Sequence, residues 1–315
     1  MMLTSSRSKS ELFVERLAMR VPWAMLVVLV VTQGACSAYS EPPIPAGQLV
    51  REVVYNELND HARHGYWRYW VERQSQAGTL TEDQVETADG PIARLALING
   101  RELTPEAEQQ EQERLGRLLS SRDEQVRQSR LYDEDEERIG RILDLLPTAF
   151  VYEYDGEESS CYRLRFRPNP VVEAHTTEAR IFHAMSGSLW VDARSKRLAR
   201  LEGHVDENVD FGFGILGRLY KGGSVRLVRE QVSATEWKTK SLEVHMNIRA
   251  LLVKTFARET NEVRGGFVPV PAGMSMEQGL ALLDQGETAT DAENMSQKLS
   301  GGNGLLAATD PAMHR

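Results

Sequence analysis

The chain has 315 residues, a net charge of −9 and a hydrophobic fraction of 41%. A chain of this length and apolar content can bury a core of its own, which excludes a purely disordered protein. Its acidic balance argues against nucleic acid and anionic membrane surfaces as direct partners.

The first 38 residues follow the order of a secretory signal peptide. Arg20 supplies the positive charge, the apolar run Val21–Val31 follows it, and small residues up to Ala38 offer a peptidase site. The run has eleven residues, fewer than the roughly 20 that cross a bilayer core. Met19 is an alternative start of the chain. We therefore expect an exported protein that is periplasmic or associated with the outer membrane.

Cys36 leaves the processing of this leader open. It ends a lipobox-like motif, whose cysteine would be lipidated and become the mature N-terminus, although Gln33 stands where such motifs usually have leucine. Soluble export after Ala38, lipidation at Cys36 and a retained membrane anchor therefore remain alternatives. Cleavage after Ala38 leaves Cys161 as the single cysteine, so that product forms no intramolecular disulfide.

A proline-rich linker and a helix are expected to follow the leader. The prolines of residues 39–47 predict an extended linker. Apolar residues then recur at helical spacing and predict a helix over 48–63. His61 and His64 lie on it, but a metal site needs a third ligand that is not in view. We therefore expect no metal there.

The pattern changes to a period of two after Gly65. Alternation predicts three strands, over 66–74, 79–87 and 91–98. Asp-Gly at 89–90 and Asn-Gly at 99–100 are strong hairpin signals, so we expect an antiparallel meander.

Residues 104–146 predict a helical insert. Thr104 is an N-cap followed by proline, and a break is expected near 120–123. The acidic run 133–137 lacks the spacing and glycine of a calcium loop and is interpreted as a solvated helix face. Pro147 is expected to end the helix. Two apolar stripes face a partner, made by Leu115, Leu118 and Leu119, and by Ile139, Ile142, Leu143 and Leu146.

Strand patterns repeat about every ten residues from 150 to 270, which is typical of antiparallel sheet. Turns are expected at 155–156, 193–196, 222–223 and 265–266. The clearest strand, 241–258, places Leu242, Val244, Met246, Ile248 and Leu252 on one face. A sheet of this many long strands must curl. We therefore predict an α+β fold in which a strongly curved antiparallel half-barrel has helices packed on its concave side, followed over 272–315 by a short helix (276–283) and a disordered tail.

Four segments carry a family resemblance, at 86–90 (E-T-A-D-G), 99–104 (N-G-R-E-L-T), 184–192 (A-M-S-G-S-L-W-V-D) and 196–203 (K-R-L-A-R-L-E-G). In this order, after a signal and a helix, they resemble the periplasmic lipoprotein-carrier superfamily, the LolA-like proteins. The resemblance implies a half-barrel over about 48–271, closed by helices over an apolar cavity that takes acyl chains. It transfers no individual binding residue.

No catalytic or cofactor motif accompanies these patterns. The sequence lacks a Gly-x-Ser-x-Gly elbow, a P-loop, a His-Glu-x-x-His zinc motif and a dinucleotide fingerprint. The glycine-rich stretch 211–217 has no P-loop ending and is interpreted as a bent strand. His204, which alternates with Glu202, Asp206 and Asp210, is the remaining basis for a hydrolase. We therefore expect a non-enzyme without cofactors.

The leading expectation is a protein that binds a lipid or a lipoprotein acyl chain. Two alternatives stay open: an envelope module that binds another envelope protein without a ligand, and an unrecognised hydrolase. The same apolar side chains would simply fill a core if no pocket exists. The expected lining is Leu115, Leu118, Leu119, Ile139, Ile142, Leu143, Leu242, Val244, Met246 and Ile248.

Overall fold

The structure is a computed structural model and describes residues 44–61, 65–211, 217–250 and 254–285. All of them belong to one compact unit, which begins at Ile44. The leader and most of the proline-rich linker lie outside the described residues, as do the glycine-rich stretch 212–216 and the tail beyond 285. The expectations for those segments therefore stay predictions.

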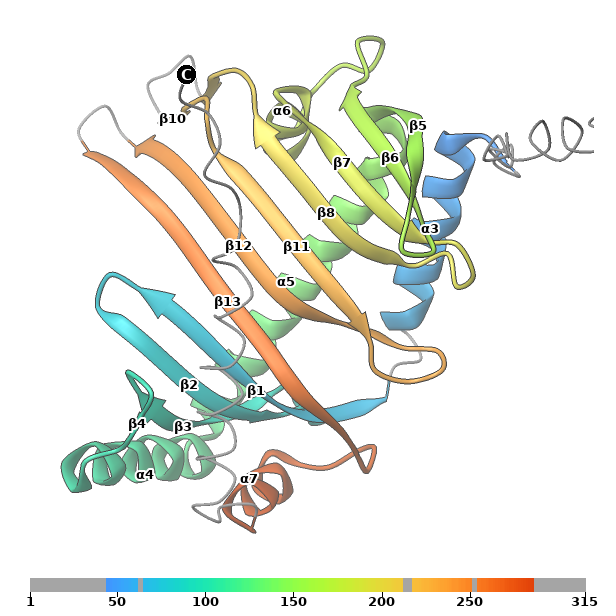
Figure 1. The fold of residues 1–315 in the computed structure, drawn as a ribbon. Helices are drawn as coiled ribbons and strands as arrows, with labels where there is room; N and C mark the ends of the chain where they lie inside the picture. The colour runs from blue at the N-terminus through green and yellow to red at the C-terminus, as the bar shows by residue number, and fades with distance from the viewer. Residues whose placement is uncertain (1–43, 62–64, 212–216, 251–253, 286–315) are drawn as a thin grey trace, which may run out of the picture. The chain divides into compact units, whose positions relative to one another are not determined.

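A single antiparallel sheet forms the body of this unit (Figure 1). Its strands follow the order β4-β3-β2-β1-β13-β12-β11-β8-β7-β6-β5, and β10 pairs with β12 and β9. The strands are β1 (Tyr66–Ser75), β2 (Gly78–Val85), β3 (Ile92–Ile98), β4 (Arg101–Glu102), β5 (Phe150–Glu158), β6 (Cys161–Pro168), β7 (Met185–Asp192), β8 (Leu198–Val205), β9 (Val209–Phe211), β10 (Gly217–Leu219), β11 (Ser224–Gln231), β12 (Trp237–Ala250) and β13 (Lys254–Val270).

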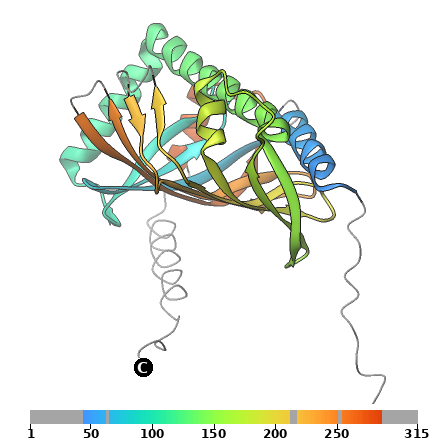
Figure 2. The same ribbon diagram turned by 90° about the horizontal axis from the view of Figure 1, so that it is seen from above.

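The sheet is curved and open, and the helices lie mainly on its concave side (Figure 2). The long helix α5 crosses that side diagonally from the β2–β3 end to β5. The predicted α+β class and curved antiparallel sheet are thereby confirmed. The helices are α3 (Ala46–His61), α4 (Pro105–Ser120), α5 (Arg122–Ala149), α6 (Thr177–His183) and α7 (Met276–Gln285).

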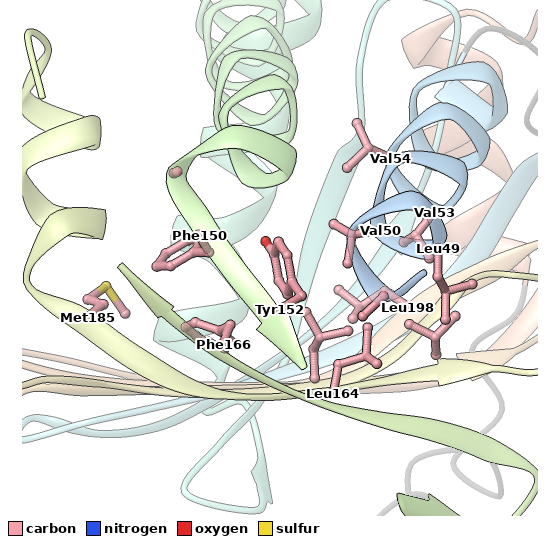
Figure 3. Packing of buried hydrophobic residues seen from close by; sticks show 14 of the residues in the cluster. Leu49, Val50, Val53, Val54, Phe150, Tyr152, Leu164, Phe166, Met185 and Leu198 are labelled. Atoms are coloured by element: carbon pink, nitrogen blue, oxygen red, sulfur yellow. The ribbon is translucent and has the colours of Figure 1, made fainter. Parts of the chain in front are cut away.

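The main core lies where α3, the end of α5 and strands β5–β8 meet (Figure 3). Helix α3 buries one face, and its Leu49 is completely enclosed. The rings of Phe150 and Phe166 pack edge to face, with centroids 4.8 Å apart. Gly187 and Gly203 are paired opposite each other beside Phe166, where a Cβ on Gly187 would approach the Phe166 ring to 2.8 Å. Glycine at this pair therefore makes room for the ring.

Helices α4 and α5 begin as the sequence predicts. Thr104 accepts a hydrogen bond from the amide of Ala107, and Ser121, between the two helices, accepts one from the amide of Glu124. The expected stop at Pro147 is wrong, because α5 continues to Ala149. The side chain of Thr148 donates to the carbonyl of Leu145 and Tyr152 donates to that of Leu146, so two carbonyls of the last turn find partners.

Three strand boundaries differ from expectation. The stretch 241–258 is not one strand but the two sides of the β12–β13 hairpin. Asp155-Gly156 forms a bulge inside β5, and the turn lies at Ser159-Ser160, where both residues have positive φ. Gly265-Gly266 lies inside β13, where a Cβ on Gly265 would come within 2.7 Å of the Trp70 ring. Alternation alone cannot separate a bulge from a turn.

One free edge of the sheet is covered by α4. The amide of Leu95 in β3 donates to Glu111 at 2.8 Å, and Arg114 donates to the carbonyl of Ala93 at 2.7 Å. Gln128 of α5 donates to the carbonyl of Pro91 at 2.6 Å. These side chains satisfy edge groups that would otherwise be open to pairing with another chain.

Helix α7 packs on the same end of the sheet. Its Met276 and Leu283 form a second small core with Val85, Ile92 and Leu118 of α4. Arg94 ties α4 and α7 together through Glu108 and Asp284, at 3.0 and 2.9 Å.

Candidate functional site on the concave face

Helix α5 is supported at its two ends. At one end Tyr132 lies against Gly90 and Gln128 bonds β3, and at the other Leu143 and Leu146 pack on the main core. Between them, none of residues 133–141 is buried, and Ile139 is 43% exposed. The middle of the helix is therefore a bridge over the sheet rather than a packed layer.

An apolar strip lies on the concave face beneath this bridge. Val225 and Leu227 of β11 pair with Val244 and Leu242 of β12, which puts all four on one face. Met246 and Ile248 continue the strip, and both pack against the main core, as Val225 and Leu227 do. All of these side chains are only half-buried. Their neighbours Glu243, His245 and Asn247 point to the opposite face, as alternation predicts. We call these six residues, Val225, Leu227, Leu242, Val244, Met246 and Ile248, the apolar strip.

An ionic strip continues the same face beyond β12. The register pairs Leu242 with Glu262 of β13, and Glu262 with Arg73 of β1. Glu262 is bonded by Arg73 at 2.9 Å and by Arg264 at 2.5 Å, and Arg73 also pairs with Glu82 of β2. Burial by itself would lower the pKa of Arg73, but Glu82 and Glu262 raise it overall. These four residues, Arg73, Glu82, Glu262 and Arg264, are the ionic strip.

Aromatic side chains border the ionic strip. Arg264 lies 5.8 Å from the centre of the Tyr69 ring, and Phe267 packs on that ring with centroids 5.1 Å apart. Trp67 and Val71 lie on the same face of β1 and share this cluster. Nearby, Glu86 accepts two hydrogen bonds from Lys238. The concave face thus changes from apolar at β11–β12 to ionic and aromatic at β13, β1 and β2.

Nine of the ten residues expected to line a pocket divide into two groups, and the tenth, Ile139, is exposed on the bridge. Leu143, Met246 and Ile248 gather at the main core, with Leu242, Val244 and Ile142 half-buried along the same side. Leu115, Leu118 and Leu119 lie elsewhere. Leu118 and Leu119 pack in the second core with α7, and Leu115 is buried on α4. The expected contact of α4 with β12 does not form, because α4 covers the β3 edge.

The ionic strip was missed from the sequence. Each of its charges sits in an alternating strand, where a solvent-facing position is the default reading. Arg73 and Glu262 are 189 positions apart. No local signal tells which distant strand pairs with which, so only the register reveals that the charges face the concave side.

The residues around His204 do not form a hydrolytic triad. Ser186 Oγ lies 3.3 Å from His204 Nε2 and donates to Asp206 at 2.6 Å. Asp206 therefore contacts the serine and lies 3.8 Å from the same Nε2, whereas a triad carboxylate holds the other ring nitrogen. Asp210 pairs with Arg218 and Glu202 with Arg200, so neither joins His204.

Other surface features bear less on function. A surface pocket of about 250 Å³ lies between the starts of α5 and α7 and is lined mostly by polar side chains, among them Arg122, Gln125 and Ser129. Among the described residues there is no group of three or more His, Cys, Asp or Glu that could hold a metal ion. A search of the same residues for a helix long and apolar enough to cross a membrane also finds none.

The fold and this surface define the chain as an α+β protein with a curved, open antiparallel sheet bridged by a helix. No protein-family model and no curated protein match the sequence. A solved structure of a DUF1329 family protein from Desulfovibrio piger is similar at 13% sequence identity, with a TM-score of 0.26, over 72% of this chain and 95% of that one. We base nothing about function on a likeness of this size.

Proposed function

We propose that the protein binds an acyl chain of a lipid or lipoprotein between α5 and the concave face of the sheet. The proposal rests on the incomplete cover that the middle of α5 gives to the sheet. None of residues 133–141 is buried, and the apolar strip beneath them is half-buried although it lies on the inner face of the sheet. Incompletely covered apolar side chains on an inner face are the kind of surface that an apolar ligand completes.

The free energy gained by burying methylene groups can support binding of an acyl chain of modest length. Each methylene that leaves water contributes about 0.8 kcal/mol. A chain that covers the apolar strip gains several such increments, which must exceed the cost of association before binding is measurable. The main core is filled by side chains, so we place the chain along the strip and under the bridge rather than inside that core.

The leader sequence bears on where in the cell the protein acts. The signal-like leader is the basis for proposing that the protein is exported and acts in the envelope, where lipids and lipoproteins are available. An enzymatic role lacks a supporting constellation among the described residues, and we propose a binding function without a cofactor.

Met246→Glu tests the proposal. Met246 lies on the apolar strip in the long strand β12, so a carboxylate there must be desolvated or protonated when a chain binds. We expect the variant to bind a fluorescent acyl probe about tenfold more weakly or worse, measured by fluorescence titration with a labelled fatty acid and its glycerol ester.

Asn247→Glu is the matched control. Asn247 is the next residue of β12, is exposed and points to the opposite face, so this variant should bind like the parent. Thermal unfolding of both variants shows whether the fold is kept. If the folded parent binds neither probe, the acyl-chain proposal is wrong and the alternative of an envelope protein-interaction module takes its place.

A further inference from the structure

Two tyrosine hydroxyls near the ionic strip lack partners. Tyr69 is 6% exposed, yet no group in the described part of the chain accepts or donates a hydrogen bond at its hydroxyl. The Tyr69 oxygen is not one of the fully buried side-chain atoms that lack a partner, so it can still be reached from outside the protein and can donate to a bound molecule. Burial raises the pKa of Tyr69 to about 12, and the hydroxyl therefore keeps its proton at neutral pH.

The second hydroxyl belongs to Tyr132 of α5. Its Cβ lies 3.6 Å from the position that a Cβ on Gly90 would take, which anchors the residue where the bridge leaves β2 and β3. Tyr132 is half-buried and, like Tyr69, has no hydrogen-bond partner among the described residues. Burial raises the pKa of Tyr132, and the charges of Glu136, Glu86 and Tyr69 add to the rise. Tyr132 lies on the bridge and Tyr69 on the sheet, and Tyr69 is near enough to contribute to the raised pKa of Tyr132.

Tyr69 points toward that space and not away from it. Its neighbour Arg68 reaches the carbonyl of Leu282 in α7, on the other face of β1. Tyr69 shares its face with Arg264, and Arg264 is hydrogen-bonded to Glu262. Glu262 in turn is paired with Leu242 of the apolar strip. The hydroxyl thus lies at the polar end of the surface whose apolar end is proposed to hold the chain.

The charges around the two hydroxyls are balanced. Arg73 pairs with both Glu82 and Glu262, and Arg264 pairs with Glu262. Lys238 pairs with Glu86. The bridge above carries the acidic run 133–137, three of whose carboxylates pair with Arg130, Arg138 and Arg141. No cation described in this group is left over for an anion, and the acidic bridge disfavours one.

We propose that the ligand is an uncharged acyl ester or amide, whose carbonyl oxygen accepts hydrogen bonds from Tyr69 and Tyr132 while its chain lies on the apolar strip. This inference rests on the proposed function and names its substrate class. Two neutral hydroxyl donors suit a carbonyl oxygen, which can accept two hydrogen bonds. A free carboxylate brings a charge that finds no unpaired cation there and must be desolvated.

Chain-matched probes test the inference at pH 8, where a fatty acid is ionised. The glycerol ester should bind at least tenfold more tightly than the fatty acid of the same chain. Tyr69→Phe should weaken ester binding about three- to tenfold, the effect of losing one ordinary hydrogen bond, and leave fatty-acid binding unchanged. Tyr132→Phe should act in the same direction and does not depend on the fold around β1.

Tyr55→Phe is the control, because Tyr55 is 68% exposed on the outer face of α3 and should affect neither probe. Equal or tighter binding of the fatty acid overturns the inference, as does ester binding that survives both Tyr69→Phe and Tyr132→Phe in folded protein. These results leave acyl binding itself intact. If neither probe binds the parent, the proposed function fails first and the inference with it.

Discussion

Glu57 shows how one side chain fixes the first helix. It lies on the buried side of α3 and accepts hydrogen bonds from Arg197 Nε and Nη2 at 3.1 and 3.0 Å and from the amide of Leu198 at 3.1 Å. Arg229 of β11 adds a third cationic contact at 2.5 Å. Glu57 and Arg197 are each 6% exposed, so these charges depend on one another. A buried ion whose partner is removed keeps its desolvation cost without compensation.

Glu57→Ala should therefore destabilise the protein by about 3–5 kcal/mol, because the buried Arg197 and the half-buried Arg229 lose their carboxylate. The free energy of unfolding, measured by urea denaturation, checks this. Tyr55→Ala, on the exposed side of the same helix, should change it by less than about 0.5 kcal/mol. Equal effects of the two substitutions would show that helix propensity and not the ion pair holds α3.

Helix α4 is the element whose role the sequence did not predict. Its capping and its apolar stripe were readable from residues 104–119, but the stripe packs on α7 and β2–β3 and not on β12. The polar side of α4 matters as much, since Glu111 and Arg114 bond the edge of β3. The opposite edge strand, β5, instead carries a bulge and acidic residues, two ordinary devices against edge pairing.

Glu111 gives this edge a pH dependence. Burial by itself would raise its pKa, but hydrogen bonds from Arg114 and the Leu95 amide, with nearby arginine charges, lower it overall. A folded pKa below the unfolded value means that the carboxylate contributes stability above the unfolded value of about 4.3. That contribution is lost as pH falls through the folded pKa.

Glu111→Gln should thus lower the free energy of unfolding by about 1–3 kcal/mol at pH 7. The gap to the parent should shrink as the pH falls below the unfolded value and through the lowered pKa of Glu111, because the parent carboxylate is then protonated as well. Denaturation curves from pH 7 to pH 3 measure both effects. A gap that stays constant across this range would contradict the role of the ionised carboxylate.

At the scale of the whole molecule, the two faces of the sheet have different characters. The convex face carries ion pairs around Trp190, whose ring is covered by Arg200 at 4.2 Å and Arg163 at 5.4 Å, and the second core with α7 lies on it at the β1–β3 end. The concave face holds the core, the apolar strip and the ionic strip. This asymmetry leaves the concave side, under α5, as the place for an apolar ligand.

Processing of the leader is a property of the whole chain. We expect protein isolated from a bacterial envelope to begin at or near residue 39, or at an acylated Cys36, because residues 20–38 have the order of a signal peptide. Intact-mass measurement distinguishes the two products. Retention of residues 21–38 would instead favour a membrane anchor.

The sequence by itself determined the class of this protein and most of its elements. Periodicity reports which face of a segment is buried, so the meander of β1–β3, the helical pair α4–α5 and the alternation in β12 were readable locally. Turn chemistry located the Asp89-Gly90 and Asn99-Gly100 turns, but it misassigned Asp155-Gly156, because a bulge and a turn use the same residues.

Only the tertiary structure decided which buried faces meet. Periodicity carries no information about a partner. Strand order depends on pairing between distant segments, as for Arg73 of β1 with Glu262 of β13, and the position of α3 depends on the contact of Glu57 with Arg197. For that reason the apolar stripe of α4 packs against α7, the middle of α5 contributes no buried residue, and charged residues to which the sequence assigned no role line the concave face. The candidate site is therefore a consequence of register, which is set by the contacts of the whole sheet at once.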